Sequence, residues 1–279
     1  MRLIKSHHSQ YVVFEAEVLN MKNKLLIIIL LLLGCLHIKA IEPPRVIHAF
    51  VALCDNVHQG IVPVPVKLGN GDDPRNNLYW GAMYGVKRFF KRSQNWTLVQ
   101  TGALNDTVLE RSIFRHKKSN TWFVADAYRG RDIKQAIFDF LSAASGSSNE
   151  RISVQLSGTK VMLNIQGHSD LAVYIGHDGL MDFNLKHYPV KQDKRVRDTI
   201  ILACLSKRYF NAPISKTGAH PILWTTGLMA PEAYTLEAAL EGWVLRESDN
   251  FIRDRAAKAY HHYQQCGMKA AKRLLVTGY

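Results

Sequence analysis

Short, unbroken apolar runs separated by segments with helical spacing constrain the fold of this chain more than any other feature. Runs of this length that are rich in Val, Ile and aromatic residues are typical of strands buried on both faces. Strands that alternate with helices favour a mostly parallel central sheet with helices on both faces, an α/β fold. We expect the buried strands at residues 46–54, 122–128, 171–176, 199–203 and 221–227, and the main helices at 78–91, 132–144, 231–245 and 249–275.

The remaining segments fit the same layout. Residues 152–156 and 160–165 flank Ser157-Gly158-Thr159, which predicts a hairpin. Short strands are expected at 96–101 and 112–115, and a helix begins at 206–210. No linker or internal repeat interrupts residues 41–279, so we expect them to form a single domain.

The first forty residues have the pattern of an upstream extension followed by an export signal. A basic stretch at 21–24 precedes nine consecutive Leu and Ile residues at 25–33, and Met21 is an alternative start. This is the layout of a signal peptide, and a spanning helix would need about 20 apolar residues. Two endings stay open. Leu32-Leu33-Gly34-Cys35 resembles a lipobox, which would leave a lipidated Cys35 attached to a membrane surface, or cleavage follows Ala40 and releases the protein. Either ending predicts an exported protein, periplasmic, secreted or outer-membrane-attached in a bacterium.

The chain is strongly basic, with a formal net charge of +13. Residues 1–40 hold five Lys or Arg and two Asp or Glu, which leaves +10 on the rest. Such a charge attracts anionic surfaces, although a solvated basic surface explains it equally simply and is the interpretation we favour. No nucleic-acid-binding motif accompanies the charge, so we expect no nucleic-acid partner. We also expect no cofactor and no metal, because the acidic loop at 69–73 lacks the spaced ligands and final Glu of a calcium loop.

A histidine and a cysteine each follow one of the apolar runs. Leu171–Gly176 leads into His177, and Thr199–Ala203 leads into Cys204. Functional sites of parallel sheets lie just beyond the carboxyl ends of the strands. A thiol at such a place becomes a nucleophile when an imidazole takes its proton, and a helix that starts after Cys204 would favour the thiolate. The alternative interpretation is that the cysteine fills the core and the histidine is a hydrogen-bonded loop residue.

The motifs Gly176-His177-Asp178-Gly179 and Ala203-Cys204-Leu205-Ser206 resemble those of the caspase-like cysteine peptidases, the group of legumains, gingipains and metacaspases. The resemblance covers most of residues 45–245 and implies a caspase-like three-layer sandwich. It also implies a peptidase with a protein or peptide substrate, in which Cys204 is the nucleophile and His177 the general base and acid. Gly179 and the amide of Cys204 would form the oxyanion hole. The family usually has Gly directly after the His, whereas this chain has Asp178.

In that family the loop after the first strand contributes to the substrate pocket. The residues that this loop offers here are Asp55, Asn56, Asp72, Asp73 and Arg75. Acidic side chains would suit Lys or Arg in the substrate, and Arg75 would suit Asp or Glu, while turn formation is the simpler role for each. A Cys54–Cys266 disulfide would leave Cys204 as a free thiol. Two other functions stay open: an inactive caspase-like binding or scaffold protein of the cell envelope, and a basic protein that binds the envelope surface.

Overall fold

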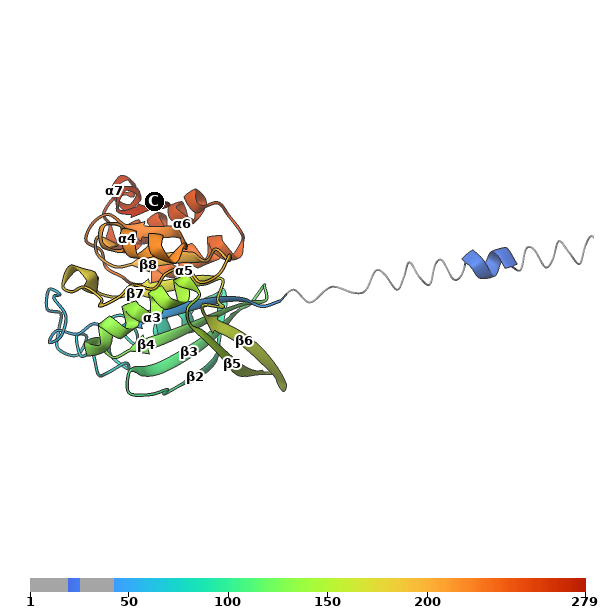
Figure 1. Cartoon of the computed structure of the whole chain (residues 1–279), viewed down its shortest axis with the longest axis horizontal. Helices are drawn as coiled ribbons and strands as arrows, with labels where there is room; N and C mark the ends of the chain where they lie inside the picture. Colours follow the sequence, from blue (N-terminus) through green and yellow to red (C-terminus); the bar gives the residue numbers. More distant parts are fainter. Residues whose placement is uncertain (1–19, 26–42) are drawn as a thin grey trace, which may run out of the picture. The chain divides into compact units, whose positions relative to one another are not determined.

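A sheet of eight strands, in the order β10-β9-β8-β7-β1-β4-β3-β2, organises the computed structural model, which describes residues 20–25 and 43–279 (Figure 1). β4, β1, β7, β8 and β9 are parallel to one another, whereas β2, β3 and β10 pair antiparallel at the two edges. The mostly parallel sheet is therefore confirmed. The strand bounds are β1 Arg45–Ala52, β2 Trp96–Gly102, β3 Val108–His116, β4 Thr121–Tyr128, β7 Leu171–Ile175, β8 Asp198–Leu202, β9 His220–Thr225 and β10 Leu275–Val276.

The order of the parallel strands positions the candidate site. From β1 the chain adds β4 on one side, and it then continues with β7, β8 and β9 on the other side. The connections that leave β1 and β7 therefore depart from the point where the strand order reverses, which is where ligands bind in open α/β sheets. β7 and β8 are hydrogen-bonded neighbours in register from Leu171↔Asp198 to Ile175↔Leu202. Residues that follow these two strands consequently emerge side by side.

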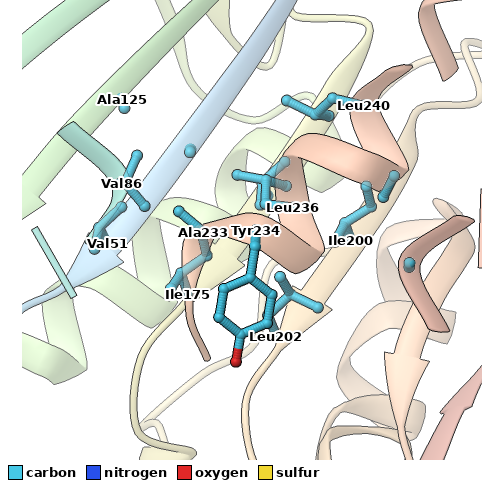
Figure 2. Packing of buried hydrophobic residues seen from close by; sticks show 14 of the residues in the cluster. Val51, Val86, Ala125, Ile175, Ile200, Leu202, Ala233, Tyr234, Leu236 and Leu240 are labelled. Atoms are coloured by element: carbon cyan, nitrogen blue, oxygen red, sulfur yellow. The ribbon is translucent and has the colours of Figure 1, made fainter. Parts of the chain in front are cut away.

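Helices cover both faces of the sheet, and alternate residues of β1 show why. Ile47, Ala49 and Val51 belong to a core cluster with residues of α2, α5, α6 and α7. Phe50 and Ala52 point the other way and belong to a cluster with residues of α3 and α4. Figure 2 shows Leu236 and Leu240 of α5 lying against the sheet on the face that Ile47, Ala49 and Val51 occupy. The bounds are α2 Val86–Lys91, α3 Ile133–Ser145, α4 Ser206–Thr217, α5 Ala233–Val244, α6 Asp249–Gln264 and α7 Met268–Leu274.

The predicted hairpin is present as a separate two-stranded sheet, β5 Asn149–Leu156 and β6 Thr159–Gln166 (Figure 1). Its buried residues Val154, Leu163 and Ile165 pack in a third core cluster that includes Trp122 and Val124 of β4. The hairpin therefore covers the antiparallel side of the main sheet, away from the ends of β7 and β8.

The predicted helix over residues 78–91 is wrong for its first half, since only Val86–Lys91 is helical and residues 78–85 form turns. Two glycines explain the difference. A Cβ on Gly81 would lie 2.0 Å from the Arg75 carbonyl oxygen, and a Cβ on Gly85 would lie 2.5 Å from backbone atoms of Trp80. These close approaches require tight turns in which only glycine fits.

The predicted final helix over 249–275 is also wrong in its continuity. It is two helices, α6 and α7, separated by residues 265–267. Gln265, with φ 52° and ψ 28°, adopts the left-handed conformation that ends α6, and Gly267, with φ 83° and ψ 139°, directly precedes α7.

Residues 44–279 form one compact unit, and residues 20–25 form a short helix in a separate one. Most of the apolar run at 25–33, together with Cys35 and Ala40, lies outside the described residues, so export and lipidation stay predictions. Among the described residues, no helix is long and apolar enough to cross a membrane.

Candidate functional site

His177 occupies a tight turn directly after β7. Gly176 before it has a φ of 150°, and a Cβ there would lie 2.9 Å from the carbonyl oxygen of Ala52. The His177 carbonyl accepts hydrogen bonds from the Tyr174 hydroxyl at 2.7 Å and the Gly179 amide at 3.0 Å. The backbone of His177 is thereby fixed, although its side chain keeps some exposure, with 8 % of the residue accessible.

An aspartate that the sequence analysis did not single out holds the imidazole. His177 Nε2 lies 2.6 Å from Asp182 Oδ2, and the same oxygen accepts the Gly60 amide at 3.2 Å. Asp182 follows the short 3₁₀ helix η2, Gly179–Met181. Because a carboxylate accepts, the imidazole donates from Nε2, and its Nδ1 has no hydrogen-bond partner among residues 43–279. That nitrogen is available to accept a proton.

Cys204 follows β8 at the entrance to α4, in the place that the sequence predicts. Leu205 adopts a left-handed conformation with φ 53°, which turns the chain from the strand into the helix. The Ser206 amide donates to Thr225 Oγ1 at 3.1 Å, and Ser206 Oγ donates to the Ile201 carbonyl at 3.0 Å. Thr225 Oγ1 in turn donates to the Ala203 carbonyl. Two buried hydroxyl side chains, Ser206 at the start of α4 and Thr225 at the end of β9, thus hold the turn that carries the thiol.

The sulfur of Cys204 is bound to the loop after β9. The Met229 amide lies 3.4 Å from Sγ, and the Met229 carbonyl oxygen lies 3.6 Å from it. Burial raises the pKa of the thiol, the hydrogen bond from the Met229 amide lowers it, and the carboxylate of Asp178 raises it further, with a net upward shift. The resting thiol is therefore protonated at neutral pH, so nucleophilic attack requires a base.

Cys204 and His177 line the same pocket, which has a volume of about 350 Å³. Its walls come from the loops that follow β1, β7 and β9, as expected for a site at the carboxyl ends of parallel strands. The lining is mainly apolar, and Glu232 is its only Asp, Glu, Lys or Arg. The lining residues are Gly60, Ile61, Val62, Val64, Leu78, Tyr79, Gly176, His177, Met181, Cys204, Leu228, Met229, Ala230, Pro231 and Glu232.

The structure thus brings the two predicted residues into one pocket but does not join them by a hydrogen bond. The thiol donates to the Met229 carbonyl, and the imidazole donates to Asp182. Catalytic hydrogen bonds in unliganded enzymes are often long and tighten only when substrate is bound. A proton transfer from Sγ to Nδ1 requires the thiol to leave the Met229 carbonyl and turn toward the ring.

Asp178 directly follows His177 in the chain and is fully buried. Its Oδ1 accepts the Leu180 amide at 3.1 Å, while Oδ2 has no hydrogen-bond partner. Burial raises the pKa of Asp178 to about 7, against the lowering effect of the Leu180 hydrogen bond, and the charge of Asp182 raises it further. A carboxyl that changes charge near neutral pH therefore lies close enough to Cys204 to influence its thiol.

The two amides predicted for the oxyanion hole differ in this conformation. The Gly179 amide donates to the His177 carbonyl, so it is already occupied. The Cys204 amide has no backbone acceptor within residues 43–279 and is free to bind an oxyanion. The helix that would favour the thiolate, α4, starts two residues after Cys204.

Asp55 and Asn56, predicted for the substrate pocket, instead shape the loop after β1. Asp55 is buried and accepts the amides of Val57 and His58 at 2.9 and 3.1 Å. Asn56 exchanges two hydrogen bonds with the backbone of Val64, at 3.0 and 2.7 Å. Neither residue lines the pocket of Cys204 and His177, but both hold the loop that forms one of its walls.

Asp72, Asp73 and Arg75 do not line that pocket either. Asp72 forms ion pairs with Arg129 and Arg131. Asp73 accepts the Arg75 amide at 3.0 Å, as the turn-forming interpretation expects for this residue, and Asp73 and Arg75 line a different, basic hollow beside α2.

All three cysteines of the described residues are free thiols, so the Cys54–Cys266 disulfide is absent from the structure. Cys54 is buried and Cys266 is exposed. Burial raises the pKa of Cys54 to about 11, which leaves Cys204 as the thiol with both a pocket and a neighbouring base. No group of three or more metal-ligating side chains occurs among the described residues.

Three residues of the site were not predicted from the sequence. Asp182 accepts a hydrogen bond from the imidazole, the Met229 backbone contacts the thiol, and Glu232 adds a charge to the pocket. Asp182 had a signal, because it is an acid five residues after His177 in a turn region. Met229 acts through its backbone, and its side-chain identity therefore gave no signal.

Comparisons of the chain with protein-family models, with curated proteins and with solved structures found no match in any of the three.

Proposed function

We propose that this protein is a cysteine hydrolase that acts on peptide bonds, with Cys204 as the nucleophile and His177 as the general base and acid. The observation that carries the proposal is the shared pocket. Two residues that lie far apart in the unfolded chain follow hydrogen-bonded neighbouring strands and line one apolar cavity, and the imidazole is held by Asp182. Nucleophile, base and orienting carboxylate are the components of acyl-transfer sites.

The proposed reaction begins when His177 Nδ1 takes the proton of Cys204. The thiolate adds to the carbonyl carbon of the substrate, and the Cys204 amide binds the oxyanion. The imidazolium then gives its proton to the leaving amine as the C–N bond breaks, which leaves a thioester on Cys204. Water, deprotonated by the same imidazole, hydrolyses the thioester and regenerates the thiol.

A relationship to the caspase-like peptidases is part of this proposal. It is supported by the order of the two motifs along the chain, their places after β7 and β8, and the mostly parallel sheet. Export through the amino-terminal segment is likewise proposed, on the pattern of residues 21–40.

The test is selective alkylation of Cys204 by iodoacetamide, measured by mass spectrometry of the labelled peptides. Cys266 serves as the internal control, because it is exposed and is not among the pocket-lining residues. We expect His177→Ala to slow labelling of Cys204 by roughly tenfold or more at neutral pH while labelling of Cys266 stays constant. Equal rates at Cys204 in both proteins would contradict its activation by His177.

A catalytically inactive binding protein is the second candidate. It is favoured by the occupied Gly179 amide and by Asp178, whose carboxylate raises the pKa of Cys204. Peptide cleavage that is lost in Cys204→Ala would eliminate this candidate. Peptide binding that persists without cleavage in the unmodified protein would support it.

A further inference from the structure

The pocket has a charge opposite to that of the chain that forms it. The protein has a formal net charge of +13, yet no Lys or Arg lines the pocket, and its one formally charged wall residue is Glu232. Asp182, on the His177 ring, adds a second carboxylate next to the site. The field inside the pocket therefore favours a cationic group, because nearby charges dominate in a cavity partly shielded from solvent.

Glu232 has an oxygen available for a ligand. Its Oε2 accepts the Tyr234 hydroxyl at 2.8 Å and the Gln264 side-chain amide at 3.3 Å. Its Oε1 has no partner among residues 43–279 and is not closed off from solvent. Burial raises the pKa of Glu232, with the Tyr234 hydrogen bond acting in the opposite direction. A bound cation would compensate the carboxylate for its lost hydration.

The rest of the wall suits the stem of a long cationic side chain. Ile61, Leu78, Met229 and Pro231 are apolar wall residues, and the exposed Leu228 lies at the rim. Lys and Arg side chains bury their methylene stems against apolar surface and place their charge on a carboxylate. Cys204 and Glu232 both line this pocket, so the thiol and the carboxylate face the same cavity.

We propose that the pocket binds a Lys or Arg side chain of the substrate, with its apolar walls around the stem and Glu232 paired to the cationic end. This inference rests on the proposed peptidase function and adds the substrate class to it. The site differs from the predicted one, since Glu232 lies after β9 and none of the acids in the loop after β1 lines the pocket.

The first experiment compares peptide substrates that differ only by arginine or citrulline before the cleaved bond. Citrulline has nearly the shape of arginine without its charge. We expect kcat/KM to favour arginine by about tenfold or more in the unmodified protein, because the citrulline peptide leaves the carboxylate unpaired. In Glu232→Gln the preference should fall to about threefold or less. Glu237→Gln is the matched control, since Glu237 lies on α5 but lines a different pocket.

The second experiment reads the charge of the pocket without catalysis. Cys204 is labelled with a cationic aminoethyl or an anionic sulfonatoethyl methanethiosulfonate, and each rate is divided by the rate of the same reagent with free cysteine in solution. We expect the cation-to-anion ratio at Cys204 to fall about fivefold or more in Glu232→Gln and to stay constant in Glu237→Gln.

The outcomes separate this inference from the proposed function. If arginine and citrulline peptides are cleaved equally by the unmodified protein, the cationic substrate class is wrong while the peptidase stands. If neither peptide is cleaved and labelling of Cys204 does not depend on His177, the proposed function fails, and an unchanged labelling ratio in Glu232→Gln then overturns the charge assignment as well. A purely structural role for Glu232 at the start of α5 would lower the melting temperature of Glu232→Gln without changing either ratio.

Discussion

Among the histidines that contact an aspartate, His48 and His177 have surroundings that give them different roles. His48 on β1 is completely buried, with Nε2 3.0 Å from Asp126 and with Nδ1 accepting the Gln166 amide at 3.2 Å. His177 has the same partner type at 2.6 Å, but its second nitrogen is unpaired and its ring lines a pocket. A histidine-aspartate pair is therefore no sign of a site by itself. The unpaired nitrogen beside a cavity and a thiol makes the difference.

The aspartates differ in the same way. Burial alone would raise the pKa of Asp126, but hydrogen bonds from Arg111 and the proximity of His48 lower it below its ordinary value. Arg111 also contacts Glu150 of the β5–β6 hairpin, at 2.7 Å, so this network joins the hairpin to the main sheet. Asp182 is 40 % exposed at its side chain and contacts no Lys or Arg among the described residues. Asp126 therefore stabilises the fold, whereas Asp182 orients the His177 ring.

The largest effect should come from removing the charge of Asp126. Asp126→Asn leaves the half-buried Arg111 without one of its two carboxylate partners, 2.7 Å away, and should lower the free energy of unfolding by about 3–5 kcal/mol. Urea denaturation measures this loss. The labelling rate of Cys204 in the folded protein should stay unchanged. A selective fall of that rate would show that the His48–Asp126 pair also acts on the site.

The next largest effect concerns Asp178, which forms no ion pair with a Lys, Arg or His of residues 43–279. Its pKa is about 7 in the folded protein, above its ordinary value of 3.8. The folded state therefore binds the proton more tightly than the unfolded state, so the stability contributed by Asp178 is complete below pH 4 and is lost as the pH rises through 7. Asp178→Asn should remove this dependence and raise stability at pH 8 by roughly 2–4 kcal/mol.

Urea titrations of both proteins between pH 4 and 8 test this prediction. The stability difference between them should grow with pH and level off above about 7.5. A difference that is constant over the whole range would show that Asp178 does not titrate in that window. Because the Asp178 carboxylate raises the pKa of Cys204, the variant should also label faster at pH 8.

The smallest effect is expected for Asp182→Asn. The asparagine side chain retains the shape of Asp182 and removes the charge that orients and stabilises the imidazolium. We expect labelling of Cys204 to slow by about three- to tenfold, with a change in unfolding free energy below about 1 kcal/mol, because this ion pair is partly exposed. Stopped alkylation assays across pH measure the rate, and an unaltered pH profile would remove Asp182 from the proposed site.

The sequence predicted the sheet well because its strands are continuous apolar runs. β7, for example, is buried at all five positions, as a strand covered on both faces of the sheet requires. His177 and Cys204 were predictable for the same reason, since each immediately follows such a strand. Residues 78–85 were not, because their apolar spacing is helical while Gly81 and Gly85 lie in turns that bring them against the backbone of residues 74–80.

The residues that line the pocket could not be predicted from local sequence patterns. The loop after β1 was expected to supply charged pocket residues, yet it supplies apolar walls such as Ile61 and Val64. Glu232 and Met229 enter the site only because β9 lies next to β8, a neighbour relation that the apolar run at β9 does not specify. Polar side chains within the loop form hydrogen bonds with their own backbone instead, as Asn56 does with Val64.

The loop that bonds the thiol has a consequence for the timing of assembly. Met229 comes twenty-five positions later in the chain than Cys204, and between them lie α4 and an entire further strand. A growing polypeptide that ends before Met229 lacks the backbone groups that contact the Cys204 sulfur. It also lacks the pocket wall formed by the loop after β9. Any reactivity tuned by that environment is therefore absent during most of synthesis and emerges only when β9 and the loop after it are in place.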